Sequence, residues 1–213
     1  MKKHFLPLLI ILATFGIGLW AYPQLPDIVP SHWGPDGEID GYSNKNTILW
    51  IMPGIMLLIY LLLLFLPKID PNRASQPRNQ KVLVLINTLV MVILLGIHCL
   101  IISEWLGFGF DMSKLAPVIV GAIFLVIGNF MPRVQHNYFV GIRTPWTLAN
   151  EEVWRKTHLF SGRVFVVTGL LLLLSLLLPS SWQLYSLLTL IIGSTLVILG
   201  SSYYFYKQLD SVR

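Results

Sequence analysis

The residue types best suited to acid–base chemistry lie in a polar stretch at positions 132–161. His158 and Glu152 could exchange a proton near neutral pH, and Arg143 could bind a phosphate in a bidentate manner. These three residues would suit a membrane enzyme that acts on a lipid or a peptide. The same stretch also has the aromatic residues of a partner-binding platform, so an enzyme and a binding protein both stay open.

A second polar stretch, at positions 23–46, contains side chains that bind metal ions in other proteins. Asp36 and Asp40 resemble the start of a calcium loop, but such a loop has a Glu at its twelfth position, where this chain has Thr47. His32 has no second His or Cys nearby in the sequence, which disfavours a zinc site. The sequence therefore predicts a small structured cap with no metal and no cofactor.

The composition indicates that the bilayer surrounds most of the chain. The chain has 213 residues, of which 55% are hydrophobic and 12% are charged, and its mean hydropathy is +0.70. A soluble domain has roughly 25% charged residues. An ordinary soluble globule and a disordered chain are therefore excluded, and the single cysteine excludes a disulfide scaffold.

Six apolar runs are long enough, or nearly so, to cross a bilayer. A helix needs about 20 apolar residues to span a hydrocarbon core of ~30 Å. Backbone polar groups must be satisfied internally in lipid, and these runs lack the alternation of a β-barrel, so we expect helices. The predicted fold class is all-α, a polytopic bundle of six transmembrane helices: Phe5–Tyr22, Thr47–Leu66, Val82–Ser103, Leu115–Met131, Gly162–Leu178 and Trp182–Phe205.

The distribution of basic residues predicts how the bundle is oriented in the membrane. With the amino terminus inside, thirteen of the fifteen Lys and Arg fall on the inner side, and only Lys45 and Lys114 fall outside. This distribution predicts that both termini are cytoplasmic and that the chain is a multi-pass membrane protein. The cap at 23–46 then lies outside, and the stretch at 132–161 lies inside.

The order of spans and loops predicts three helical hairpins. The first, 1–66, contains the cap, the second is 67–131, and the third, 162–213, ends in a short cytoplasmic tail. The 132–161 loop joins the last two hairpins. Within this loop, Asn150 can cap a short helix that begins with acidic residues and ends with basic ones, an order that suits the helix dipole. We expect this helix to lie at the membrane interface.

Few polar residues interrupt the spans, and two of them are candidates for an internal site. Asn87 and Asn129 each lie near the inner end of a span, so we expect them to face the bundle and to bond each other or the Arg143 loop. Helix–helix packing is the alternative role for both. His98 is interpreted as a satisfied residue near the outer interface. Two pairs of small residues allow close helix contacts: Gly121 with Gly128 and Gly193 with Gly200.

Motifs of the common enzyme and pump classes are missing from the sequence. It has no glycine-rich phosphate loop, no His-Glu-x-x-His, no Gly-x-Ser-x-Gly and no run of buried charges. The spans show no clear internal repetition, which disfavours a transporter. A membrane exporter and a lipid- or peptide-directed membrane enzyme stay as alternatives to the preferred interpretation, a protein that is not an enzyme.

One string in the 132–161 loop is specific. It reads Gly-Ile-Arg-Thr-Pro-Trp-Thr-Leu at positions 141–148 and is followed by Trp154, Thr157 and His158. This pattern resembles the SdpI family of bacterial immunity membrane proteins. The first outer loop also resembles the amino-terminal domain of that family, and the length and the number of spans agree, so the resemblance covers nearly the whole chain.

The resemblance implies a function that residue spacing alone does not show. A well-known member of the family protects the producing cell from a secreted peptide toxin, and with toxin present it holds a transcriptional autorepressor at the membrane. We therefore expect an immunity protein that resists and senses a secreted antimicrobial peptide. Its expected partners are the lipid bilayer, the toxin and a cytoplasmic repressor, without direct binding of nucleic acid, and the oligomeric state is left open.

Two sets of residues would form the sites of such a protein. A toxin would bind the outer cap better in one packing of the bundle than in another. Binding would then shift the bundle toward that packing and change the inner loop. Arg143, Trp146, Trp154 and His158 are expected to form the cytoplasmic docking face. The toxin-facing set is Pro30, His32, Trp33, Asp36 and Gly37, and the inner signalling set is Asn129, Pro132, Asn137, Gly141, Arg143, Thr144, Pro145, Trp146, Thr147, Trp154, Thr157 and His158.

Overall fold

The structure is a computed structural model that describes residues 2–34, 37–65, 68, 76–108 and 111–210. In this part of the chain, six helices are long and apolar enough to cross a membrane. The predicted all-α fold with six spans is therefore confirmed. The chain divides into two compact units, Met1–Leu66 with Leu83–Met112 and Pro67–Val82 with Ser113–Arg213, and each unit is described by itself.

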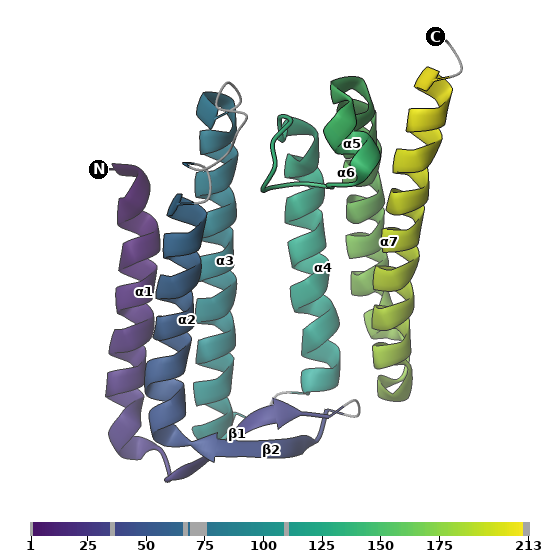
Figure 1. Cartoon of the computed structure of the whole chain (residues 1–213). Helices are drawn as coiled ribbons and strands as arrows, with labels where there is room; N and C mark the ends of the chain where they lie inside the picture. The colour runs from purple at the N-terminus through teal and green to yellow at the C-terminus, as the bar shows by residue number, and fades with distance from the viewer. Residues whose placement is uncertain (1, 35–36, 66–67, 69–75, 109–110, 211–213) are drawn as a thin grey trace. The chain divides into compact units, whose positions relative to one another are not determined.

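The first unit contains three helices and a β-hairpin (Figure 1). The hairpin connects α1 to α2, and its two strands pair antiparallel. The bounds of its elements are α1 Lys2–Ala21, a 3-10 turn Tyr22–Gln24, β1 Ile28–Trp33, β2 Ile39–Asn44, α2 Lys45–Phe65 and α3 Gln76–Trp105, of which the part from Leu83 belongs to this unit.

Apolar side chains from all three helices meet in the core of the first unit. Residues of α1, α2 and α3 form one buried cluster, and a second cluster lies where α1 and α3 approach the hairpin. Each helix therefore buries one apolar stripe against the other two, which holds the hairpin at one end of the unit. The two clusters are Ile10, Ile11, Met56, Tyr60 and Met91, and Ala21, Leu25 and Ile102.

His98 lies inside this unit. Its side chain is 0% exposed, and neither ring nitrogen makes a hydrogen bond. A Cβ atom on Gly18 would lie 3.5 Å from Nε2 of His98, so the ring packs closely against the backbone of α1. His98 is therefore buried inside the unit and is not the interfacial residue expected, and the backbone of Thr14 is the polar group next to it.

The second unit contains three long helices and the loop that precedes α6. In Figure 1, the loop between α4 and α6 lies at the same end of this unit as the carboxyl end of α7. The bounds of its elements are α4 Met112–Phe130, a 3-10 turn Met131–Arg133, α5 Pro145–Ala149, α6 Glu151–Leu174, a 3-10 turn Ser175–Leu177 and α7 Ser180–Asp210.

Helices α4 and α6 touch backbone to backbone along what we call the glycine seam, which consists of Gly121, Gly128, Gly162 and Gly169. A Cβ atom on Gly128 would lie 2.8 Å from the carbonyl oxygen of Gly162, and one on Gly169 would lie 2.8 Å from that of Gly121. The close contact predicted for the Gly121 and Gly128 pair is confirmed. By contrast, a Cβ atom on Gly193 or Gly200 would meet nothing within 4 Å.

Helices α6 and α7 form an antiparallel hairpin with a short turn. The side chain of Gln183, on α7, is buried, and its Nε2 donates to the carbonyl oxygens of Ser175 (2.7 Å) and Leu178 (3.0 Å). These bonds join α7 to the turn that follows α6, in which the Ser175 carbonyl oxygen also accepts from the Leu178 N–H at 2.9 Å. The tight turn expected between the last two spans is thus held by one amide side chain.

The helix capped by Asn150 differs from its prediction. Asn150 does cap a helix, since its Oδ1 accepts from the backbone N–H groups of Glu152 (2.8 Å) and Val153 (3.1 Å). This helix is the start of α6 and continues without a break to Leu174, so it is not a separate interfacial helix. No proline interrupts the sequence there, and the separate short helix of the loop is α5.

The grouping of the helices also differs from the three predicted hairpins. Helix α3, from Leu83, belongs to the same unit as α1 and α2, whereas α4 belongs to the unit of α6 and α7. The glycine seam explains the second assignment, because it allows α4 to approach α6 more closely than bulky side chains would permit. The order of the helices along the chain predicts that α3 pairs with α4. It does not predict that α4 packs on α6.

Candidate functional site: the β-hairpin and the signature loop

The β-hairpin, residues 28–44, has an irregular register. Bulges interrupt the register between Pro30 and His32 and between His32 and Trp33. Gly37 has φ +86° in the connecting turn, and its N–H donates to the carbonyl oxygen of Gly34 at 3.0 Å. The expected structured cap is therefore present, while Asp36 lies outside the described residues.

The exposed side chains of the hairpin are mostly polar. The His32 side chain is 73% exposed, and its Nδ1 lies 2.5 Å from Oδ1 of Asp40 on the opposite strand. Pro30 and Trp33 are half-buried. Within the described residues, no group of three or more His, Cys, Asp and Glu side chains is arranged to hold a metal ion. The hairpin therefore offers an exposed imidazole–carboxylate pair to a ligand.

The base of the hairpin is bound to the helix ends. Lys45, the first residue of α2, places its Nζ 3.0 Å from Oδ1 of Asp27 and 4.9 Å from the centre of the Tyr22 ring. The Tyr22 hydroxyl donates to Oδ1 of Asn46 at 2.8 Å. Val29 is fully buried beneath the sheet. The hairpin is therefore a fixed extension of α1 and α2.

We call residues 131–161 the signature loop, and its first turn depends on Asn137. The Asn137 side chain is 4% exposed and makes four hydrogen bonds. Its Oδ1 accepts from the N–H groups of Phe139 (2.8 Å) and Val140 (2.7 Å). Its Nδ2 donates to the carbonyl oxygens of Gln135 (2.8 Å) and Val140 (2.9 Å). One buried amide therefore satisfies the backbone of a turn that has no secondary structure.

Gly141 and His158 form the closest contact of the loop. Gly141 has φ +114°, and a Cβ atom there would lie only 2.4 Å from Nε2 of His158. The same Nε2 accepts from the N–H of Ile142 at 3.1 Å, and Nδ1 donates to the carbonyl oxygen of Trp154 at 2.8 Å. Both ring nitrogens are therefore occupied in the neutral form of His158, which binds the loop to α6.

Trp154 fills the space beneath the loop. Its side chain is stacked on His158 with ring centres 4.0 Å apart, and it meets the edge of His136 at 5.0 Å. Its Nε1 donates to the carbonyl oxygen of Val134 at 2.9 Å. Trp154 is only 2% exposed. It is therefore the apolar centre of the loop, with its one polar atom satisfied.

The short helix α5 begins with a capping box. Thr144 accepts from the N–H of Thr147 at 3.2 Å, and the Thr147 hydroxyl accepts from the N–H of Thr144 at 2.9 Å. Pro145 occupies the first helical position, where its missing N–H is not needed. The Trp146 ring packs on Tyr203 of α7, with centres 5.0 Å apart. The string at 141–148 therefore encodes one capped turn of helix docked on α7.

The predicted docking face is wrong for the residues at its centre. Trp154 and His158 are 2% and 1% exposed, so neither can be reached by a partner while the loop is folded. Thr144, Thr147 and Thr157 are buried as well. Arg143 is exposed, with Nη1 donating to the carbonyl oxygen of Tyr138 at 2.8 Å, and Trp146 is half-buried. The signature residues mostly build the loop, because they satisfy one another.

Asn129 and Pro132 have separate places at the edge of the loop. Asn129 is exposed and donates to the carbonyl oxygen of Leu125 in its own helix (2.8 Å), so, contrary to expectation, among the described residues it bonds neither Asn87 nor the Arg143 loop. The amide is satisfied locally, whereas Asn87 of the first unit is buried with Oδ1 unpartnered. Pro132 lies against Gly162, where a Cβ atom would come within 3.0 Å of its ring.

The acid–base pair considered for an enzyme is not brought together. Both nitrogens of His158 are engaged by backbone groups, as described above. Glu152 instead receives two hydrogen bonds from Arg155, at 2.9 and 2.7 Å, and lies 3.9 Å from Nζ of Lys156. These residues therefore have no geometry for proton transfer to a common substrate.

Three contributors to the loop escaped the sequence analysis. His136 packs between Trp154 and Tyr138 and lies 3.1 Å from the carbonyl oxygen of Leu148. Tyr203 comes from α7, far along the chain, and Gly169 completes the glycine seam. A buried indole N–H requires an acceptor, so Trp154 signalled that some backbone carbonyl must lie nearby. Which carbonyl oxygen accepts this bond, that of Val134, is known only from the fold.

Two family models match the chain. Residues 133–204 match the SdpI/YfhL protein family, and residues 9–57 match a domain of unknown function, DUF1648. The chain therefore resembles the SdpI family, and the family match lies in residues 133–204. Over its full length it is 28% identical to "Immunity protein SdpI" of Bacillus subtilis (strain 168), and the alignment covers 100% of both chains. No solved structure matches the chain.

The two matches correspond to the two sites described above. The SdpI/YfhL match begins within the signature loop and continues through α6 into α7, and the DUF1648 match covers most of α1, the hairpin and the start of α2. The resemblance predicted from the string at 141–148 is therefore confirmed. With its six apolar helices and its full-length similarity to an immunity protein, the chain is a multi-pass protein of the cell membrane.

Proposed function

We propose that this protein is an integral membrane immunity protein that gives resistance to a secreted antimicrobial peptide and is not an enzyme. The observation that carries the proposal is the full-length relationship to an immunity protein, which includes both the hairpin and the signature loop. The geometry agrees, because His158 and Glu152 are engaged by separate partners and do not form a catalytic pair.

We further propose that the signature loop lies in the cytoplasm and the hairpin outside. Basic residues concentrate on the loops assigned to the inner side. Within the second unit, the signature loop lies at the same end as the carboxyl end of α7, where Lys207 places its ammonium 5.8 Å from the Tyr203 ring. Both features support a cytoplasmic position for this end of the unit.

The hairpin is the proposed contact for the toxin. It presents the exposed pair of His32 and Asp40, together with Ile28 and Tyr42, which are 66% and 64% exposed. This mixture of polar and apolar groups suits an amphipathic peptide at the membrane surface. The base of the hairpin is bound to α1 and α2 through Lys45, so a contact at its tip acts on the helix ends.

The exposed rim of the signature loop is the proposed contact for a transcriptional repressor. Arg143 is exposed, Tyr138 is 43% exposed, and Pro145 lies beside them at the start of α5. Arginine and tyrosine are enriched at protein interfaces, and a rigid proline loses little freedom on binding. This rim replaces the buried Trp154 and His158 as the docking surface.

The test is expression of the chain in a bacterial host that is sensitive to the toxin of the producing strain. We expect survival with the intact chain and loss of survival with His32→Ala together with Tyr42→Ala. Candidate repressors fused to a fluorescent protein should move to the membrane when toxin is added. Arg143→Ala with Tyr138→Ala should abolish this movement while survival is retained.

The matched control for the rim is Arg155→Ala. Arg155 is exposed and basic like Arg143, but it pairs with Glu152 on α6, outside the rim. If repressor recruitment is lost with Arg155→Ala but retained with Arg143→Ala and Tyr138→Ala, the rim is not the docking surface. Failure of the intact chain to protect the host, at membrane levels equal to those of a protective relative, would contradict the immunity function itself.

A further inference from the structure

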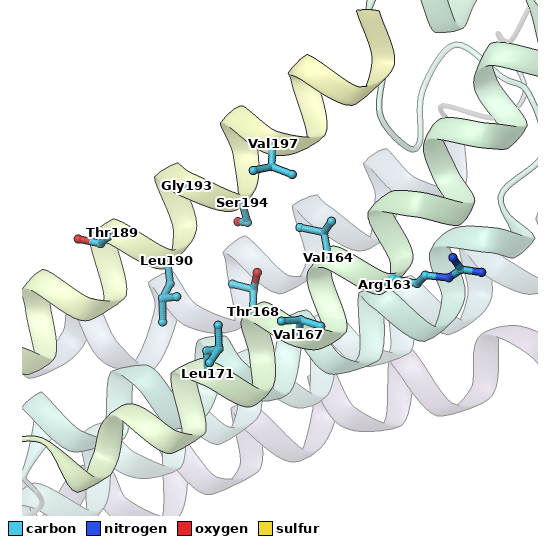
Figure 2. A pocket seen from close by; sticks show the side chains of 10 residues that line it. All are labelled: Arg163, Val164, Val167, Thr168, Leu171, Thr189, Leu190, Gly193, Ser194 and Val197. Atoms are coloured by element: carbon cyan, nitrogen blue, oxygen red, sulfur yellow. The ribbon is translucent and has the colours of Figure 1, made fainter. Parts of the chain in front are cut away.

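A membrane-embedded groove lies between α6 and α7 of the second unit. Its volume is about 360 Å³, and apolar side chains form most of its walls. That size is within the range of small-molecule sites in proteins. Figure 2 shows Arg163 at one end of the row of lining residues and Thr189 at the other, with Leu171, Thr168 and Val164 on α6 between them.

The groove exists because α7 has small residues where it passes α6. Gly193 and Ser194 line it, and a Cβ atom on Gly193 would meet nothing within 4 Å. Ser194 bonds to its own helix, donating to the carbonyl oxygen of Ile191 at 2.9 Å, so it does not bridge the gap. The apolar walls of the groove lack dispersion contacts on their open side unless an apolar group fills it.

The mouth of the groove has an unpaired positive charge. Arg163 is exposed, and among the described residues it has neither an ion-pair partner nor a hydrogen-bond partner. Its basic neighbours differ: Arg155 pairs with Glu152, and Lys207 lies over the ring of Tyr203. Arg163 lies within α6, where the polar residues of the signature loop give way to the apolar run from Val164, which is where a basic side chain typically reaches the headgroup region.

We propose that the α6–α7 groove binds one acyl chain of an anionic phospholipid whose phosphate pairs with Arg163. Lipid tails are as apolar as the groove, so the tail gains little from leaving the bilayer, and selectivity must come from the headgroup. An arginine binds phosphate through two parallel N–H donors, and basic pockets between membrane helices hold anionic headgroups. The unpaired guanidinium supplies the charge complement that such a headgroup requires.

The dimensions favour a lipid chain over a peptide helix as the occupant. A helix with its side chains is about 10 Å wide, which a gap left by one glycine and one serine between two adjacent helices does not admit. An acyl chain is unbranched and flexible, so it can lie along the groove between Thr168 and Leu190. This proposal concerns the groove alone and does not depend on the immunity function.

The experiment is native mass spectrometry of the delipidated full-length protein, titrated with phosphatidylglycerol, phosphatidylcholine or diacylglycerol. We expect one tight phosphatidylglycerol per chain and weaker binding of the other two. Arg163→Gln should weaken phosphatidylglycerol binding about tenfold, the loss expected for one charge-assisted pair. Lys207→Gln, which removes the same charge elsewhere on this end of the unit, should leave binding unchanged.

A pair of glycine variants tests the groove itself. Gly193→Leu places a side chain in the groove and should remove the tight lipid, whereas Gly200→Leu, on the same helix and also without neighbours within 4 Å, should not. Both changes raise helix propensity, so neither is expected to unfold α7. Retention of the tight lipid by Arg163→Gln or by Gly193→Leu would overturn the proposal.

Discussion

The β-hairpin and the signature loop use unusual residues in opposite ways. The hairpin directs its polar side chains outward, and the His32 and Asp40 side chains are 73% and 51% exposed. The signature loop directs its polar side chains inward, and Thr147, Thr157 and His158 are at most 1% exposed. A polar side chain of the hairpin is therefore available at the surface. A polar side chain of the signature loop instead makes a structural contact.

The difference has a physical cause. The hairpin has a ladder of backbone hydrogen bonds between two strands, so its side chains are free for other contacts. Most of the signature loop has no regular ladder, and its backbone groups are satisfied by Asn137, Thr147 and His158. Substitutions should therefore affect folding in the signature loop and binding in the hairpin, and four predictions test this contrast.

Gly141→Ala should have the largest effect. Its Cβ atom would overlap with the buried His158 ring at a backbone conformation that favours glycine, so we expect a loss of about 4 kcal/mol in the free energy of unfolding. Gly107→Ala is the control, since Gly107 also has a positive φ (+83°) but nothing within 4 Å, and it should lose about 1 kcal/mol. Equal midpoints of thermal unfolding for the two variants would contradict the tight contact.

Asn137→Ala should have the next largest effect. The change removes four hydrogen bonds and leaves buried backbone groups unsatisfied, so we expect a loss of about 3 kcal/mol. His32→Ala in the hairpin should change stability by less than about 0.5 kcal/mol, because His32 is exposed. Thermal unfolding of the purified variants distinguishes the two, and a larger loss in the His32 variant would reverse the contrast.

Trp154→Phe should have a moderate effect. Phenylalanine keeps most of the stacking on His158 but leaves the carbonyl oxygen of Val134 without its donor, so we expect a loss of about 1.5 kcal/mol. Trp146→Phe keeps the ring contact with Tyr203, so its free energy of unfolding should fall by less. The same unfolding assay applies, and amide hydrogen exchange at residues 134–136 should increase only in the Trp154 variant.

Arg143→Ala should have the smallest effect on stability. Arg143 is exposed and makes one hydrogen bond to the carbonyl oxygen of Tyr138, so we expect a loss below about 0.5 kcal/mol. Its effect should instead be on repressor recruitment, because it lies on the proposed docking rim. A strongly destabilised Arg143 variant would show that the rim, like the centre of the loop, is structural.

The sequence predicted the spans well because a bilayer imposes a simple rule. Long apolar runs between polar loops must become helices, and the ends of most spans agree with the structure within a few residues. The start of α6 is the exception. The sequence there turns polar at Glu151–Ser161 without any residue that stops a helix, and polarity alone suggested a separate element.

The site residues were identified better than their roles. The string at 141–148 with Trp154 and His158 is the compact centre of the loop, and the sequence analysis singled out each of these residues. Their burial was not predictable, because exposure depends on Val134, His136 and Tyr203, which come from outside the string. A pattern of residue types does not show whether a side chain points toward a partner or toward its own fold.

The unbroken run of α6 from Glu151 to Leu174 makes the signature loop inseparable from its transmembrane anchor. Trp154 and His158, which hold the loop, and Gly162 and Gly169, which bind α4, are on the same rigid rod. A synthetic peptide of residues 131–161 would therefore lack the framework that shapes it. Reagents raised against such a peptide would recognise an unfolded chain, so antibodies to this loop require the intact protein in a bilayer or detergent micelle.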